Sequence, residues 1–270
     1  MNSQQTPCQS FNLLSIVSLL GILCFGTVAQ AAQTTYFIAV DNLQELTSGP
    51  YVNLDNPNYE RLTFLFAHYN EDTPSSNHFH AIGAYSYTGP ADTPTIISTN
   101  SNNRIPEISS EEPPLGLERG TGCYSLRLIS KANESEYSHL QIESIWTLSE
   151  YRSDSPRGYL FESSGGRWKT ELTGAVIALQ LVDIADGLHI SNELGEIILR
   201  RVGETYILGD GDTLSFTPTF WTGRWMHTGT YSATFKLIDL SFSETRLPDS
   251  GTFTLDFEVP PHHGRISWKD

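Results

Sequence analysis

The sequence predicts an all-β protein, an antiparallel β-sandwich with long surface loops and at most one short helix. The first observation is strand-like alternation. In "GTFTLDFEV" the apolar side chains at every second position from Phe253 to Val259 share one face, and polar side chains occupy the other. The second is that stretches rich in Gly, Pro, Asn and Ser separate such segments, as turns do. The third is that few segments have apolar residues at helical spacing.

Further strands are expected in segments of similar pattern along the chain. "AVIALQLVDI" is apolar on both faces, as expected for a strand that two layers cover. "LGDGD", residues 208–212, predicts a tight hairpin between two strand patterns. The expected strands are residues 34–40, 61–69, 77–89, 175–184, 205–216, 230–240 and 251–259.

One short amphipathic helix is expected over residues 194–202, where apolar residues recur at helical spacing. Asn192 is its expected N-cap and Gly203 its stop. The stretch from Thr88 to Gly122 is rich in Pro, Ser, Asn and Thr, and we expect it to run largely as surface loop.

The N-terminal residues 1–31 are typical of a secretory signal peptide, with an apolar run and then a small-x-small cleavage pattern at Ala29-Gln30-Ala31. We therefore expect an exported protein that is periplasmic, cell-surface or secreted. After signal removal, no apolar run is long enough for a stable membrane span. Strands continue without a linker-like composition shift, which predicts a single β-sandwich-like domain over residues 32–259 and a C-terminal tail over 260–270.

Cleavage would remove Cys8 and Cys24 and leave Cys123 as the one cysteine of the mature chain. No internal disulfide is then expected, and Cys123 is interpreted as a small buried residue.

The charge of the chain argues against nucleic acid as a partner. Lys and Arg total 16 against 31 Asp and Glu, so the formal net charge is -15. Phosphate binding needs the opposite sign of field, whereas an acidic surface attracts cations. Solubility of an exported protein explains such a charge equally well.

The histidine pattern is the strongest indication of chemistry. His78 and His80 in "NHFHAIGAYSYTG" share one face of a predicted strand, because side chains alternate along it. His68 closes the apolar stripe of the preceding strand at the same period. If the two strands pair as a hairpin with that stripe opposite Ile82, His68 lies near His78 or His80. Three imidazoles then converge at one end of a sheet, although an isolated His-x-His is also common as a polar strand face.

Imidazole ligands favour zinc, copper, nickel or cobalt over calcium or magnesium. A thiolate-rich zinc site is excluded, because the mature chain lacks a second cysteine. We therefore expect a site with three histidines for zinc, copper, nickel or cobalt. The fourth position is expected to be open, or filled by Asp72, Glu71 or His227.

The sequence gives little indication of other functional sites. No hydrolase elbow, P-loop or dinucleotide fingerprint is present, so we do not expect an enzyme. A zinc hydrolase would need a general base beside the metal, which the sequence does not place. The aromatic stretch "FTPTFWTGRWMHTGTY" fits a sandwich core best, but it also keeps open a metal-free module that binds glycan or another envelope component.

Several segments together resemble one known family: "TTYFIAVDNL", "NHFHAIGAYSYTGP", "NNRIPE", "SSGGRW", "GDGDTLSFTPTFWT", "GTYSATFKLIDL" and "SGTFTLDF". The family consists of exported cyanobacterial proteins whose genes are repressed by the zinc-uptake regulator, and many members carry a PEP-CTERM sorting signal. The present chain departs from it at the end, because "FEVPPHHGRISWKD" lacks that signal.

The resemblance implies a role under zinc shortage, in zinc acquisition, buffering or transfer. By that implication His78 and His80, and with them His68, are the metal ligands. It also implies a zinc transporter component or an envelope protein as the partner.

Overall fold

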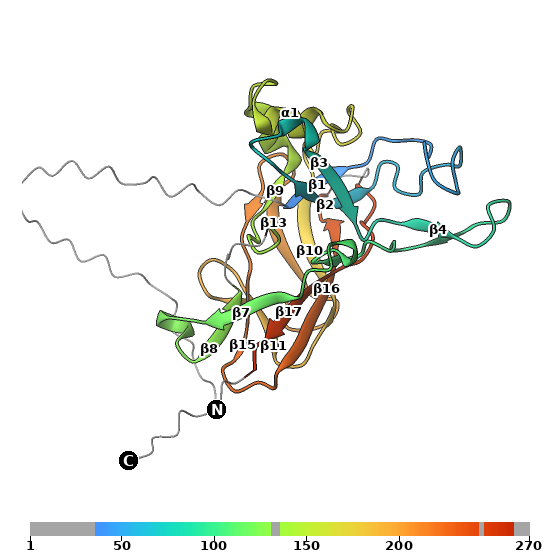
Figure 1. The fold of residues 1–270 in the computed structure, drawn as a ribbon. Coiled ribbons are helices and arrows are strands. Elements are labelled where there is room, and N and C mark those ends of the chain that lie inside the picture. Colours follow the sequence, from blue (N-terminus) through green and yellow to red (C-terminus); the bar gives the residue numbers. More distant parts are fainter. Residues whose placement is uncertain (1–35, 131–135, 243–245, 262–270) are drawn as a thin grey trace, which may run out of the picture.

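The computed structural model describes residues 36–130, 136–242 and 246–261, and Figure 1 shows their arrangement. Strands dominate, and most neighbouring strands are antiparallel. The predicted all-β fold class is therefore confirmed. The predicted signal peptide and most of the predicted tail, with His262 and His263, lie outside the described residues.

The smaller of the two main sheets has five strands in the order β14-β9-β1-β2-β3. Its antiparallel part runs from β1 (Tyr36–Val40) through β2 (Leu62–His68) to the edge strand β3 (His78–Ile82). β9 (Ile142–Ser144) joins β1 in parallel, and β14 (Ser215–Phe216) pairs with β9. All of β1 is buried, because both faces of this sheet are covered.

The larger sheet follows the order β12-β11-β15-β8-β7-β17-β16-β10-β13, and β6 also pairs with β17. A separate ribbon of β4 (Ser86–Thr88) and β5 (Thr95–Ile97) projects to one side in Figure 1. The strands of the larger sheet are β6 (Arg104–Ile105), β7 (Leu115–Arg119), β8 (Arg127–Ser130), β10 (Val176–Ile184), β11 (Leu188–Ser191), β12 (Ile197–Ile198), β13 (Thr205–Asp210), β15 (Thr219–Gly223), β16 (Gly229–Asp239) and β17 (Phe253–Val259).

The core lies between the two sheets and is rich in aromatic rings. Phe64 of β2 stacks on Phe253 of β17, with ring centroids 4.0 Å apart and planes 3° from parallel. Phe66 stacks on Tyr137 at 4.6 Å. Burial of these large rings is the main stabilising contribution, because apolar area removed from water lowers the free energy of the folded state.

A second apolar cluster covers the opposite face of the smaller sheet. Phe37 and Leu65 pack there against Trp168 and against residues of α1 (Pro156–Glu162) and η4 (Ile145–Glu150). The remaining 3-10 segments of the described residues are η1 (Pro74–Ser76), η2 (Ile108–Ser110) and η3 (Gly122–Tyr124).

The prediction of a helix over residues 194–202 is wrong. The chain there forms a turn and then β12, which pairs with β11. The side-chain oxygen of Asn192 accepts hydrogen bonds from the backbone N–H groups of Leu194 (3.1 Å) and Glu196 (3.0 Å). Asn192 therefore closes a turn instead of capping a helix, since its side chain offers the backbone an alternative to helical bonding.

The hairpin predicted at "LGDGD" is also wrong. β13 pairs with β10 in the larger sheet, whereas β14 pairs with β9 in the smaller one. The chain thus crosses between sheets at this point. Asp212 anchors the crossing, because its carboxylate accepts from the backbone N–H of Leu172 (2.9 Å) and the hydroxyl of Thr173 (2.6 Å).

Residues 88–122 contain more structure than the expected surface loop. They include β5, β6 and β7, and β6 pairs with β17 so that Ile105 is fully buried. Gly83, at the end of β3, approaches the other sheet closely: a Cβ there would lie 2.1 Å from the carbonyl oxygen of Thr252. Its N–H donates to the carbonyl of Asn102, which holds residues 100–102 beside β3.

Cys123 departs from its predicted environment. It lies exposed in η3 and is disulfide-bonded. The expectation of no internal disulfide applies to a chain without Cys8 and Cys24, and these two residues lie outside the described residues. In the part of the chain that the structure describes, no helix combines the length and apolar character needed to cross a membrane.

Candidate metal site

The three predicted histidines lie on the paired strands β2 and β3. His68 is opposite His78, and Phe66 is opposite His80. Because alternate residues of a strand share a face, His78 and His80 lie on the face of Ile82, which packs in the core between the sheets. The histidines continue this apolar face to the end of the sheet.

The structure brings the three imidazoles together. One ring nitrogen from each lies within 4.8 Å of the others. Nε2 of His78 is 3.2 Å from Nε2 of His80, and Nε2 of His68 is 3.1 Å from Nδ1 of His80. The group could therefore hold a metal ion.

Glu107 adds a carboxylate that sequence reasoning did not predict. It is 2% exposed. Its Oε1 lies 2.7 Å from Nδ1 of His80, and its Oε2 lies 2.9 Å from Nε2 of His68. The side-chain amide of Asn102 donates to Oε1 (2.6 Å), and the hydroxyl of Tyr137 donates to Oε2 (3.2 Å). One buried carboxylate thus links two of the three histidines.

Sequence reasoning missed Glu107 because it lies in the segment expected to be surface loop. A hint is the apolar pair Ile105-Pro106 directly before it, in a stretch that is otherwise polar. Pairing of β6 with β17 buries Ile105, and this fixes the following carboxylate beneath the histidines.

The carboxylate and the histidines shift one another's protonation. Burial alone would raise the pKa of Glu107, but hydrogen bonds with His68, Asn102 and His80 outweigh it and lower the pKa to about 2. The hydrogen bond with Glu107 raises the pKa of His68 above 6.5, against the opposing effect of its partial burial. Glu107 is thus ionised at neutral pH.

Hydrogen-bond partners fix which ring nitrogens carry protons. Nδ1 of His78 lies 2.8 Å from the backbone carbonyl oxygen of Ser76, so this nitrogen is the donor and Nε2 is the ring nitrogen that faces His80. Nδ1 of His80 faces the ionised carboxylate of Glu107, so it also donates. The two Nε2 atoms then face each other at 3.2 Å. A proton shared between them, or a metal ion bound by both, bridges this gap.

The spacing suits a tetrahedral metal ion. Zinc–nitrogen bonds of about 2.0–2.1 Å at tetrahedral angles place ligand nitrogens roughly 3.3 Å apart. The observed separation of 3.2 Å between the Nε2 atoms of His78 and His80 agrees with that edge. A carboxylate on the far nitrogen of a ligating imidazole, as Glu107 is on His80, is the usual partner that orients such a ligand.

The cluster is accessible from solvent. His78 is exposed, and the side chains of His68 and His80 are 27% and 38% exposed. A groove of about 470 Å³ lies beside His80, lined among others by Asn102 and Ile108. The exposed carboxylate of Glu136 lies 3.8 Å from Nδ1 of His68.

The other predicted ligands are not members of this group. His227 is exposed and lies two residues before the start of β16 in the larger sheet. Glu71 and Asp72 are exposed in the loop before η1, where the side chain of Asn70 accepts the N–H of Asp72 at 2.8 Å. Among the described residues, the carboxylate that contacts the histidines most closely is Glu107.

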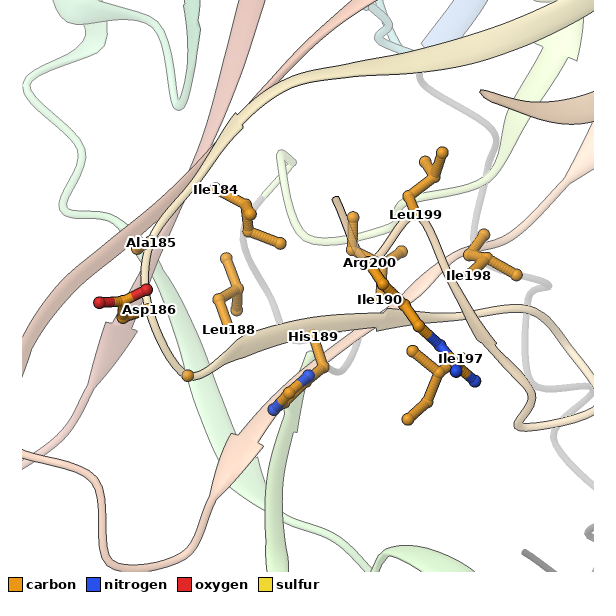
Figure 2. A pocket seen from close by; sticks show the side chains of 11 residues that line it. Ile184, Ala185, Asp186, Leu188, His189, Ile190, Ile197, Ile198, Leu199 and Arg200 are labelled. Atoms are coloured by element: carbon orange, nitrogen blue, oxygen red, sulfur yellow. The ribbon is translucent and has the colours of Figure 1, made fainter. Parts of the chain in front are cut away.

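A larger cleft elsewhere offers no comparable arrangement. It measures about 560 Å³ and is lined by residues 184–190 and 197–200. Figure 2 shows Leu188 facing the cleft, while His189 and Arg200 point away from one another and Asp186 points outward. Its polar side chains do not converge, so we place no site there.

The aromatic stretch of residues 216–231 divides between core and surface. Phe220 and Trp221 are buried, and Trp221 lies between the ring of His189 (4.2 Å) and the guanidinium of Arg127 (3.7 Å). Trp225, in contrast, is 80% exposed.

Comparison with models of known families, with curated proteins and with solved structures returned no match.

Proposed function

We propose that this protein binds zinc through His68, His78 and His80 and serves zinc acquisition, buffering or transfer outside the cytoplasm. One observation carries the proposal: the Nε2 atoms of His78 and His80 face each other at 3.2 Å while both Nδ1 atoms are bound to acceptors. Two ring nitrogens in that arrangement are bridged by a shared proton or by a metal ion, and the third imidazole within 4.8 Å favours the metal.

Ligand chemistry supports a transition metal. Imidazole nitrogen suits zinc, copper and nickel, whereas calcium and magnesium prefer oxygen. The resemblance to a family repressed by the zinc-uptake regulator favours zinc among these metals. The formal charge of -15 would concentrate cations around the chain.

Binding rather than catalysis is supported by the state of Glu107. Each of its carboxylate oxygens already contacts two groups, His80 and Asn102 at Oε1, and His68 and Tyr137 at Oε2. It therefore orients ligands and has little capacity left to activate a water molecule. The accessible position at the edge strand β3 suits exchange of the ion with a transporter component or an envelope protein.

Metal content and a competition titration test the proposal. We expect near-stoichiometric zinc in untagged protein, and loss of it in the double variant His78→Ala, His80→Ala. His227→Ala is the matched control, because His227 is exposed and outside the group, and it should keep its zinc. Wild-type protein that takes up no zinc, copper or nickel at neutral pH would sink the proposal.

A further inference from the structure

We infer that this protein has a second binding site, which goes beyond the metal site and takes an uncharged sugar ring. The site is a pocket of about 410 Å³ between the segment before β2 and the β4–β5 ribbon. Its walls include the rings of Tyr51, Tyr85 and Tyr87, and its polar groups include Asn100 and Ser101. A volume of this size falls in the range of small-molecule pockets, about 300–1,000 Å³.

Two of the three tyrosine rings are held in place by their hydroxyls. The hydroxyl of Tyr51 donates to the carbonyl of Gly89 at 2.7 Å, and that of Tyr87 donates to the carbonyl of Asp55 at 2.9 Å. The two rings lie 5.4 Å apart with planes tilted by 46°. Because these hydroxyls are already bound, what the two residues offer a ligand is rigid ring surface.

Tyr85 is held differently and keeps its hydroxyl. Its backbone N–H and carbonyl are both bound by the buried side chain of Asn58, at 2.7 and 2.8 Å. The guanidinium of Arg61 lies over the ring, 4.2 Å from its centroid. Within the described part of the chain, the Tyr85 hydroxyl has no hydrogen-bond partner, so it is available to a ligand.

The side chain of Asn100 is a fixed part of the pocket wall. Its amide nitrogen donates to the carbonyl of Ala81 in β3 at 3.2 Å, which orients the amide. Its oxygen is closed off from solvent and has no partner among the described residues, so a ligand in the pocket meets other polar groups, the hydroxyls of Tyr85 and Ser101.

The charge of the pocket indicates a neutral ligand. None of its lining residues is charged, although the chain as a whole carries a formal charge of -15. Arg61, whose guanidinium lies over the ring of Tyr85, is already bound to the carbonyls of Pro57 and Asp249. An ionic ligand would find no counter-charge here.

A sugar fits these groups better than a proline-rich peptide, the other common occupant of tyrosine-lined grooves. A polyproline segment has carbonyl acceptors and few N–H donors, so it can only accept from the hydroxyls of Tyr85 and Ser101. A sugar ring carries C–H faces that pack on tyrosine rings and hydroxyls that both donate to and accept from those two hydroxyls.

The test is a screen of the full untagged chain on an array of neutral oligosaccharides, followed by calorimetric titration with the best binder. We expect saturable binding that chelators leave unchanged, so its failure is distinguishable from failure of the zinc site. Tyr51→Ala should weaken binding about tenfold or more through loss of ring contact. Tyr85→Phe keeps the ring and should weaken it about three- to tenfold through loss of one hydroxyl.

Tyr159→Phe is the matched control, because Tyr159 lies exposed on α1, and it should bind as the wild type does. The Tyr85→Phe variant keeps the experiment informative if Tyr51→Ala unfolds. The inference is overturned if no neutral oligosaccharide binds at millimolar concentration. Binding that is unchanged in both Tyr51→Ala and Tyr85→Phe, or binding of a proline-rich peptide in place of sugars, also overturns it.

Discussion

Nδ1 of His80 donates to the carboxylate of Glu107 at 2.7 Å, across 27 residues of chain. This bond turns the other nitrogen of the ring, Nε2, toward His78. The buried carboxylate therefore determines what the exposed end of the cluster offers to a metal ion, and each prediction about the site follows from this relationship.

Replacing Glu107 by Gln removes the charge but keeps the shape. We expect the variant to bind zinc about 10–100-fold more weakly, because the partner that orients two imidazoles is impaired. A zinc competition titration with a chromogenic chelator measures the change. Glu136→Gln is the control, since Glu136 is exposed and lies 3.8 Å from His68. Equal losses in both variants would show that only overall charge matters.

The free energy of unfolding of the metal-free protein should be highest at mildly acidic pH and should decrease at both lower and higher pH. The folded-state pKa of His68 is raised above 6.5, so its contribution is complete below that pH and is lost as the pH rises through the raised pKa. The pKa of Glu107 is lowered from 4.5 to about 2, so its contribution is present above 4.5 and is lost as the pH falls toward 2. We expect the melting temperature of the wild type to decrease between pH 6 and pH 8 relative to that of His68→Ala, as followed by circular dichroism with chelator present. A difference between the two proteins that stays constant over this range contradicts the assigned pair.

Zinc affinity should show the opposite pH dependence. Metal and protons compete for the same imidazole nitrogens, so affinity should rise as the pH increases through the ordinary histidine range near about 6.5. Isothermal titrations at mildly acidic, neutral and mildly alkaline pH test this, and zinc binding should release protons into the buffer. Affinity independent of pH would count against histidine ligation.

The aromatic contact between the sheets should dominate stability. Phe253 is 1% exposed and stacks on Phe64. We expect Phe253→Ala to lower the free energy of unfolding by about 3–5 kcal/mol, measured by urea denaturation. Phe242→Ala is the matched control: Phe242 is fully exposed, and its loss should change stability by less than about 0.5 kcal/mol. Similar effects of the two changes would argue against the described sandwich core.

The sequence could predict that three histidines come together, because their positions depend on the pairing of two neighbouring strands. These histidines are His68, His78 and His80. The two strands are consecutive, and the apolar stripe of β2 must face the core, which leaves few registers for the pair. Glu107 could not be found this way. Its position depends on the pairing of β6 with β17, strands about 150 residues apart, whose partners no local pattern specifies.

The incorrect prediction of a helix over residues 194–202 has a similar explanation. Apolar residues over 194–202 fit a helix and a hairpin equally well, and the choice depends on Asn192. Its side chain closes the turn by binding two backbone N–H groups, those of Leu194 and Glu196, and Ile198 then pairs with Ile190 of β11. Side-chain bonding of this kind cannot be read from periodicity alone.

X-ray absorption at the zinc edge, on protein loaded with one equivalent of zinc, identifies the ligands of the bound ion. We expect a first shell of nitrogen and oxygen at about 2.0–2.1 Å, with the outer-shell scattering of three imidazoles. We also expect loss of imidazole scattering in the double variant His78→Ala, His80→Ala. A shell of water and carboxylate oxygen without imidazole scattering in the wild type would contradict ligation by these histidines.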